Sequence, residues 1–590
     1  MNHRYPSFKR NRFLFVTAAL LCVAYGQAQV VDTYQKQLNE YIDRLEAFGL
    51  SGQVLVAEKG KVILDKAYGI ADKPRRLRVT SHTVFNIASL SKQFTAEAVL
   101  RLEMDGKLKV GDRIGKYFEE VPEDKSEITI HHLLTHTSGL RRDVIRPAEP
   151  NPVSKEGFVK KILESQMGFK VGGRYAYSNA GYQLLAAIIE RVSSQTYQDY
   201  LNQHIFQLAG MTNTGSYQNA RWQNANIAHG YDEWKETGTF LSKPKGWNHT
   251  GSGGLVSTTG DLYRWFVVLQ GEKILSSKQK EKLFAKHTAT PDSTTYYGYG
   301  WYVKSFADGR ELIFHGGDNE GYHSEFRWYP AEDRVIIILT NQDIFGIDGG
   351  AVQKRIMANN IVRILSREKY VEPPQIVKSG TVSLDKYVGD YEGPGAKFKI
   401  WLDGEHLKMG AEGQEAVNAL LASDDSTGRL YASLNRRAEM VLKAVSEGKD
   451  STVRKMLSEE EFGFYIPFLK EELHSMEERL GSFKGLVLPG TRPLPWDVKS
   501  LRTYAILQFE KGTSDLFLGW GDGKLNDVTT EEGRPFPVML PLAPQSAKNF
   551  TSFDPITSMT VSVIFLFDAN SRVSGLMIRH EGEKVIALKR

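Results

Sequence analysis

The stretch FNIASLSKQFTA, residues 85–96, places a serine three positions before a lysine, Ser89 and Lys92, at the start of a helical pattern. Residues i and i+3 of a helix lie on one face with their side chains in contact. A serine hydroxyl becomes a nucleophile when a base takes its proton, and a lysine can be that base if burial or a nearby cation lowers its pKa. The spacing therefore predicts a nucleophile and its base in one cleft, with the serine in the positive field of a helix N-terminus.

The spacing alone is a weak signal, because it recurs in polar segments typical of loops or solvated helix faces. Examples are Ser242/Lys245, Ser277/Lys280 and Ser446/Lys449. The setting of Ser89 is different, since Phe94, Ala98 and Leu102 follow it at helical spacing. We therefore expect the helix that carries Lys92 to be buried on one side.

Five further short motifs follow Ser89 in a fixed order. They are LLTHTSGL from Leu133, YAYSNAGYQLL from Tyr175, GSGGLVSTTGDL from Gly251, YGYGW from Tyr297 and HGGDNEGY from His315. Together with Ser89 and Lys92 they resemble the serine beta-lactamase and penicillin-binding-protein family, in its class C-like branch with D-aminopeptidases, D-alanyl-D-alanine carboxypeptidases and esterases. The resemblance spans roughly residues 35–366. It implies a mixed α/β fold and hydrolysis through an acyl-enzyme.

The resemblance assigns Tyr177 and Asn179 to the family's second element, a tyrosine and an asparagine two places apart. Tyr177 is then a catalytic proton carrier, with a pKa lowered by the Lys92 ammonium, and Asn179 a substrate contact. A rival match, Tyr217 and Asn219, lies in a polar stretch, whereas Tyr177 follows a glycine turn and precedes a long apolar helix. We therefore prefer Tyr177.

The third element of the family is a basic residue and glycine on an edge strand, and His315 and Gly317 match it. Glycine lets a substrate backbone approach such a strand closely. The resemblance implies that His315, Gly317 and Asp318 bind substrate, and that the backbone N–H groups of Ser89 and Asp318 form the oxyanion hole. A histidine in place of the lysine of true beta-lactamases is mostly neutral at pH 7, which disfavours beta-lactam hydrolysis.

A metal site is the alternative interpretation of His132 and His136, which are four residues apart. The segment HLLTH lacks the glutamate of a zinc hydrolase and continues directly into the turn Thr137-Ser138-Gly139. We therefore predict no metal and no cofactor. The expected partner is a small-molecule or short-peptide substrate, with peptidoglycan fragments as one source.

The first 28 residues have the pattern of a secretory signal peptide. Four basic residues precede the apolar run 13–26, which is too short to span a bilayer, and small residues stand before the expected cleavage after Ala28. Loss of this leader takes the formal net charge from +5 to +1, which does not indicate nucleic acid as a partner. We expect a secreted or periplasmic protein without a transmembrane segment.

The pattern after the leader predicts three folded domains. A beta-lactamase-like domain over 29–366 has an antiparallel sheet, flanking helices and a helical region inserted between its first and last strands. The charged, proline-containing segment 367–379 reads as a linker. Short strands over 380–434 suggest a small lipocalin-like β-barrel, and helices followed by long strands over 436–590 suggest an α+β domain similar to the NTF2-like fold.

The sequence favours a secreted serine hydrolase that acts on D-amino-acid peptides or esters. Two alternatives remain: a true beta-lactamase, and a non-catalytic protein that binds or senses cell-wall fragments. An intact set of catalytic side chains argues against the second alternative.

Overall fold

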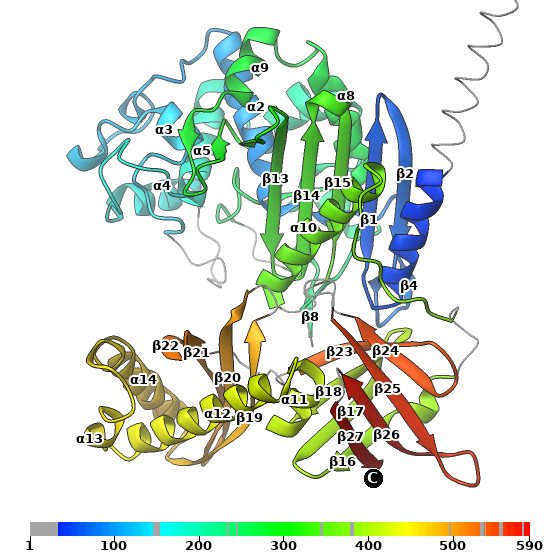
Figure 1. Ribbon diagram of the computed structural model, residues 1–590. Helices are drawn as coiled ribbons and strands as arrows, with labels where there is room; N and C mark the ends of the chain where they lie inside the picture. The colour runs from blue at the N-terminus through cyan, green and yellow to red at the C-terminus, as the bar shows by residue number, and fades with distance from the viewer. Residues whose placement is uncertain are drawn as a thin grey trace, which may run out of the picture.

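The computed structural model of the chain describes residues 33–144, 154–232, 235–242, 246–342, 346–377, 383–494, 497–530, 536, 538–553, 559–580 and 583–590. The predicted signal peptide, 1–28, lies outside these residues. Figure 1 shows a large N-terminal domain above two smaller units, a barrel and an α+β unit. Within the described residues, no helix combines the length and apolar character that a bilayer crossing requires.

An eight-stranded antiparallel sheet forms the centre of the first domain, in the order β10-β11-β12-β13-β14-β15-β1-β2. Its strands are β1 (Gly52–Glu58), β2 (Lys61–Tyr68), β10 (Thr288–Ala289), β11 (Thr295–Tyr297), β12 (Tyr302–Ser305), β13 (Glu311–Asn319), β14 (Tyr322–Tyr329) and β15 (Arg334–Thr340). The first strand pairs with the last along its whole length, Gly52 with Thr340. The prediction of a helical region inserted between the first and last strands of one sheet is therefore confirmed.

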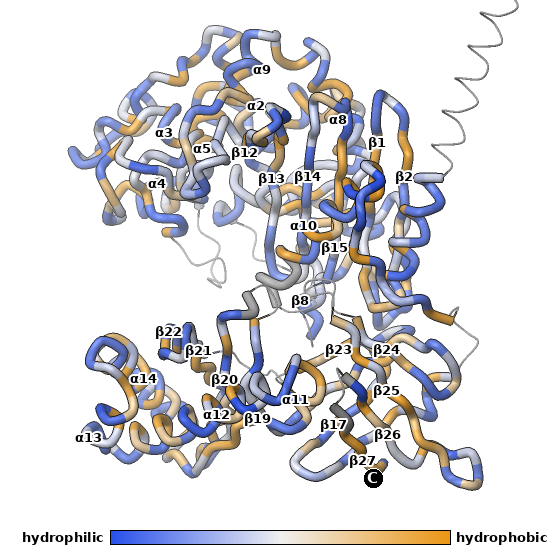
Figure 2. Tube along the Cα trace, viewed as in Figure 1, coloured by the Kyte–Doolittle hydropathy of each residue, from blue (hydrophilic) through white to orange (hydrophobic). Residues whose placement is uncertain are grey.

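The central strands are buried on both faces. In β15, Ile337 and Leu339 contribute to the core under the helical region, while Ile336 and Ile338 contribute to a second core on the opposite face. The sequence of such a strand is a continuous apolar run, because successive side chains point to opposite faces and both faces are buried. Figure 2 shows the resulting hydrophobic colour of β15 and of its neighbour β1.

The helical region covers one face of the sheet. Its main helices are α2 (Ser91–Met104), α3 (Ile130–Leu134), α4 (Lys155–Glu164), α5 (Asn179–Ser193), α8 (Thr259–Gln270) and α9 (Ser277–Phe284). The expectation that α2 is buried on one side is wrong, because residues 91–100 are all buried. Aromatic rings of neighbouring elements enclose it, as where Phe94 packs against Phe206 and Trp265.

The opposite face of the sheet is covered by a helix over 33–46 and by α10 (Gly346–Leu365). Figure 1 shows α10 crossing in front of the strands. Residues of the C-terminal barrel contribute to the same core, and the Phe48 and Phe553 rings lie 5.6 Å apart. The described part of the predicted linker has no helix or strand over 368–377.

A closed eight-stranded barrel follows, and its strands come from two separate parts of the chain. They are β16 (Gly389–Gly393), β17 (Ala396–Asp403), β18 (His406–Glu412), β23 (Val538–Pro544), β24 (Asn549–Phe553), β25 (Thr560–Phe567), β26 (Val573–His580) and β27 (Glu583–Lys589). The prediction of a complete barrel within 380–434 is therefore wrong. Three strands cannot close a barrel, and β18 pairs with β23, Ala411 opposite Val538.

An α+β unit lies between β18 and β23. After α11 (Gln414–Leu421), the helices α12 (Asp425–Ser446), α13 (Asp450–Val453) and α14 (Glu459–Leu480) precede a sheet of β19 (Phe483–Leu494), β20 (Asp497–Phe509), β21 (Gly512–Gly521) and β22 (Lys524–Thr530). The predicted order of helices before strands is correct, but the boundaries 436–590 are wrong. Position 436 lies inside α12, and the last five strands belong to the barrel. The likeness to the NTF2-like fold stays a prediction.

Candidate active site

Ser89 lies in a single 3-10 turn, Ala88–Leu90, between β5 (Phe85–Asn86) and α2. Ala88 has a positive φ of 45°, a strained conformation for a residue with a Cβ. Side chains on both sides hold the turn: Asn86 Oδ1 accepts from Ala88 N at 2.9 Å, and Ser91 Oγ donates to Ala88 O at 2.7 Å. The backbone before the nucleophile is thus fixed in an unusual geometry by its own neighbours.

Lys92 lies within reach of Ser89 in a fully buried position, as the spacing predicts. Its Nζ is 3.1 Å from Ser89 Oγ, 2.8 Å from Asn179 Oδ1 and 2.7 Å from the carbonyl oxygen of Ser252. Burial lowers the pKa of Lys92 well below its ordinary value. A neutral amine has two N–H bonds, which the two carbonyl oxygens accept, and one lone pair, which remains for the Ser89 hydroxyl proton.

Tyr177 lies beside both residues, with Lys92 Nζ 4.8 Å from the centre of its ring. The expectation that Lys92 lowers the pKa of Tyr177 is wrong. Burial raises that pKa well above its ordinary value, and the hydrogen bond with Ser89 opposes this effect only in part. Tyr177 is therefore a neutral phenol, and Lys92 is the base.

The rival tyrosine, Tyr217, lies elsewhere. It is buried in a small separate cluster with Trp222 and Phe240. Asn179, the partner of Tyr177 in the motif, begins α5 and bridges two groups, since its Oδ1 faces Lys92 while its Nδ2 donates to Asp143 Oδ1 at 2.8 Å. The structure thus brings Ser89, Lys92, Tyr177 and Asn179 together.

His315 lines the cleft, but both of its ring nitrogens are used within the protein. Nδ1 donates to the Gly316 carbonyl at 2.6 Å, so Nε2 accepts from the Tyr297 hydroxyl at 3.1 Å. Burial, followed by the charge of Lys92, lowers the pKa of His315 to about 3. The ring is therefore neutral and offers neither charge nor a spare N–H to a substrate.

Gly317 packs against the turn that carries Ser89. A Cβ at this position would lie 2.4 Å from Ile87 O and 2.8 Å from Ser89 N. The prediction that Gly317 faces the substrate is therefore corrected, because Gly316, its neighbour on the other face of β13, lines the cleft instead. Because Gly317 has no side chain, β13 and the turn that carries Ser89 can lie close together.

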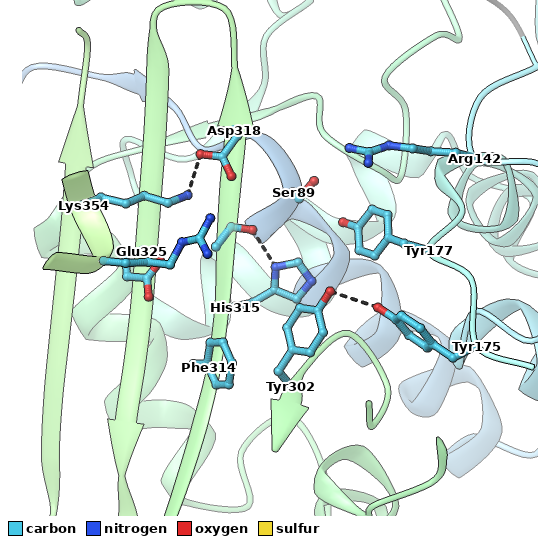
Figure 3. A pocket seen from close by; sticks show the side chains of 12 residues that line it. Ser89, Arg142, Tyr175, Tyr177, Tyr302, Phe314, His315, Asp318, Glu325 and Lys354 are labelled. Atoms are coloured by element: carbon cyan, nitrogen blue, oxygen red, sulfur yellow. Dashed lines mark hydrogen bonds and ion pairs between the residues drawn. The ribbon is translucent and has the colours of Figure 1, made fainter. Parts of the chain in front are cut away.

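Asp318 is the penultimate residue of the same strand and lies beside Ser89 in the cleft. Its Oδ1 accepts hydrogen bonds from Lys354 Nζ and His323 Nδ1, both at 2.7 Å. Figure 3 shows Asp318 between Lys354 and Ser89. The carboxylate thus binds within the protein, and its place at the end of β13 is fixed from two sides.

The cleft has two halves, of about 390 and about 240 Å³, which share Ser89, Arg142 and Asp318. The larger half is also lined by Tyr175, Tyr177, Tyr302, Phe314, His315, Gly316, Glu325, Lys354 and Arg355. The smaller half adds Ala88, Asp143, Asn179, Asn248, His249, Ser252, Gly253, Asn319 and Glu320. A cleft that extends to both sides of the nucleophile can hold the acyl part of a substrate on one side and its leaving group on the other.

Arg142 is the main residue of the cleft that sequence reasoning missed. Its side chain is 72% exposed, and its guanidinium carbon lies 5.6 Å from the centre of the Tyr177 ring. Figure 3 shows it extending over Tyr177. The feature of the sequence that could have identified Arg142 is its position, two residues after the motif LLTHTSGL.

The histidines that suggested a metal have structural partners. His132 Nδ1 accepts from Thr129 N at 3.2 Å and completes the cap of α3, while His136 Nδ1 accepts from Ser178 N at 3.0 Å. The His136 ring packs against Tyr177 at a tilt, with ring centres 4.3 Å apart. His132 therefore stabilises the start of α3, and His136 positions the backbone next to Tyr177.

The expected edge strand is instead an interior strand of the sheet, because β13 lies between β12 and β14. A nucleophilic serine with a buried lysine base and a neutral phenol beside this strand defines a serine hydrolase that works by acyl transfer. The comparisons with known proteins agree. A family model described as Beta-lactamase matches residues 38–351. The chain belongs to this family and is one of its serine hydrolases.

Several relatives are penicillin-binding proteins. Penicillin-binding protein 4* of Bacillus subtilis is 28% identical over 416 residues, which cover 66% of this chain and 90% of the relative. Protein flp of Staphylococcus aureus is 29% identical over 324 residues, 52% of this chain and 63% of the relative. The solved structure of the octameric penicillin-binding protein homologue from Pyrococcus abyssi is 18% identical and covers 93% of this chain and 99% of its own, with a TM-score of 0.51. The likeness to the Pyrococcus abyssi structure shows the fold alone.

Proposed function

We propose that this protein is a secreted or periplasmic serine hydrolase that cleaves D-amino-acid peptides or simple esters through an acyl-enzyme. One observation carries the proposal: Ser89 Oγ lies 3.1 Å from the Nζ of a fully buried lysine whose pKa is strongly lowered. A general base must lie within hydrogen-bond reach of the proton that it takes and be uncharged at the working pH. Lys92 lies within this reach, and its strongly lowered pKa favours the uncharged amine.

The reaction then follows from the positions of the groups. Lys92 takes the Ser89 proton while Ser89 Oγ forms a bond to the substrate carbonyl carbon, whose π electron pair moves to the oxygen. As that pair returns, the bond to the leaving group breaks. Tyr177 gives its proton to the leaving group and regains one from the Lys92 ammonium. Water repeats the sequence in the second half-reaction, with Lys92 again as base, and releases the acid.

The charge of the cleft suggests how the substrate is held. Because His315 is neutral and fully bonded, the exposed guanidinium of Arg142 is the group that we expect to attract a substrate carboxylate. A short peptide with a free C-terminal carboxylate, as in peptidoglycan fragments, fits this arrangement. Asn179, beside Lys92, can contact the substrate amide.

A beta-lactamase is the nearest alternative, and two labels separate it from the proposed activity. Fluorophosphonate and a fluorescent penicillin would each be applied to the protein and to Ser89→Ala. We expect a fluorophosphonate adduct that is absent in Ser89→Ala, and either no penicillin adduct or a stable one. Rapid turnover of the penicillin would identify a beta-lactamase. If neither reagent reacted at Ser89, the protein would be a binding protein without acyl transfer.

The predicted leader supports export and has a test of its own. If the signal peptide is removed after Ala28, mass spectrometry of the exported chain should find Gln29 as the first residue. An intact leader on the exported chain would contradict the cleavage.

A further inference from the structure

Lys354 is a buried cation beside the catalytic cleft to which the motifs and the reaction above give no role. It lies on α10, is 1% exposed and lines the larger half of the cleft. A buried charge is costly unless it is paired and hydrogen-bonded. Lys354 has two such partners, because its Nζ donates to the Gly317 carbonyl oxygen at 2.8 Å and to Asp318 Oδ1 at 2.7 Å.

The first of these partners belongs to the peptide unit that joins Gly317 to Asp318. A trans peptide unit is planar, and its C=O and N–H bonds point in opposite directions. The described chain contains no cis peptide bond. Because the Gly317 carbonyl is directed at Lys354, the Asp318 N–H is directed away from Lys354.

Ser89 lies on the side to which that N–H points. In Figure 3, Lys354 and Ser89 stand on opposite sides of the end of β13. The backbone at Gly317 approaches the nucleophile so closely that a Cβ there would lie 2.8 Å from Ser89 N. The Asp318 N–H and the Ser89 N–H therefore lie close together at the position where a substrate carbonyl oxygen must sit for attack by Ser89.

We propose that Lys354 is a positioning residue that orients and polarises the Asp318 N–H for binding of the oxyanion. The inference rests on the proposed function. Lys354 fixes the plane of the peptide unit before substrate arrives, so no reorganisation is needed as charge develops. Its positive charge on the carbonyl also draws electron density from the N–H of the same unit, which makes that N–H a stronger donor.

The Asp318 side chain completes the arrangement. Its carboxylate accepts from Lys354 and from His323, the residue opposite it on β14. Burial opposes ionisation of Asp318, but the charge of Lys354 and the hydrogen bond from His323 hold its pKa below the usual range. The carboxylate therefore stays charged and keeps the lysine in place against the Gly317 carbonyl.

The kinetic test compares the full-length protein with Lys354→Met, which keeps the length of the side chain and removes the charged donor. With an ester substrate, we expect kcat to fall on the order of 10- to 100-fold with little change in KM. The affinity for a boronic acid, which forms a tetrahedral adduct at Ser89, should fall by a similar factor. The carbonyl band of the acyl-enzyme should move to higher frequency, because a weaker hydrogen bond polarises the carbonyl less.

A matched control separates this effect from the loss of any buried lysine. Lys73 is also a mostly buried lysine bonded to a carboxylate, Asp403, but it lies outside the cleft. Lys73→Met should therefore lower stability without changing kcat, the boronic acid affinity or the carbonyl band. If Lys354→Met behaved like Lys73→Met, with lower stability and unchanged catalytic parameters, the inference would be wrong.

A second measurement does not depend on activity. In protein labelled with ¹⁵N-aspartate, the Asp318 amide proton of Lys354→Met should shift upfield relative to the parent. An unchanged signal would overturn the inference even if the protein had no hydrolase activity. If the signal shifted but Ser89 reacted with no label, the contact would stand and the proposed function would fail.

Discussion

At the scale of the residue, the charges around Lys92 decide the pH at which the protein works. Burial lowers the pKa of Lys92 most strongly, Asp143 raises it, and Arg142 lowers it further. Arg142 and Asp143 are adjacent in sequence and shift the pKa of Lys92 in opposite directions. Since the base must be uncharged, activity is lost as the pH falls through the pKa of Lys92 and is present above it.

The first prediction removes the charge of each of these two residues in turn. Arg142→Gln removes a positive charge, so the pKa of Lys92 rises and the acid limb of kcat/KM moves to higher pH. Asp143→Asn removes a negative charge and keeps an oxygen for the Asn179 amide, so the limb moves to lower pH. The measurement is the pH profile of kcat/KM on an uncharged ester, whose own binding is insensitive to the Arg142 charge. Shifts of the same sign in the two variants would contradict the role of Lys92 as base.

At the scale of the element, the approach of β13 to the turn of Ser89 fixes the active site. Gly317 makes this possible, and its backbone conformation is one that other residues can adopt, since its φ is not in the left-handed region. The requirement for glycine is therefore steric. A Cβ would lie 2.4 Å from both Ile87 O and Ser324 Oγ, so strand and turn would have to move apart.

The second prediction follows from this contact. Gly317→Ala should lower kcat/KM by about 100-fold or more, because a displacement of about 1 Å at a catalytic group is sufficient for such a loss. Circular dichroism should show that the fold is retained. Gly463→Ala on α14 is the control, since a Cβ there meets nothing within 4 Å, and it should leave activity unchanged. Full activity in Gly317→Ala would mean that the approach of β13 is not needed.

At the scale of the whole molecule, the barrel shares a hydrophobic core with the hydrolase domain, whereas the α+β unit has a separate core. The barrel shares a hydrophobic core with α10 and the helix over 33–46. At the same boundary, Lys73 Nζ and Asp403 form an ion pair at 2.8 Å. The α+β unit has its own core, which begins at Ala422 and includes α12 and α14.

The third prediction compares two shortened chains. A chain that ends at residue 367 should be poorly soluble and melt at lower temperature, because it exposes the core shared with the barrel. A chain in which a flexible linker of about ten residues replaces 425–530 should stay folded and react with fluorophosphonate at Ser89. Melting temperature and labelling measure both. If the first chain were as stable as the parent, the barrel would be an independent domain.

The sequence by itself determined the motifs and their order. These identified the family, the sheet with its inserted helices, and the residues Ser89, Lys92, Tyr177 and Asn179. Contacts within a helix or along one strand depend on residues that are near in sequence, so a pattern can reveal them. Only the tertiary structure decided that β18 pairs with β23 across more than a hundred intervening residues. It also decided that Arg142 and Lys354 enter the cleft and that Tyr177 stays a neutral phenol. Strand pairing over such distances, and the burial that sets a pKa, depend on which distant segments pack together, and no local pattern contains that information.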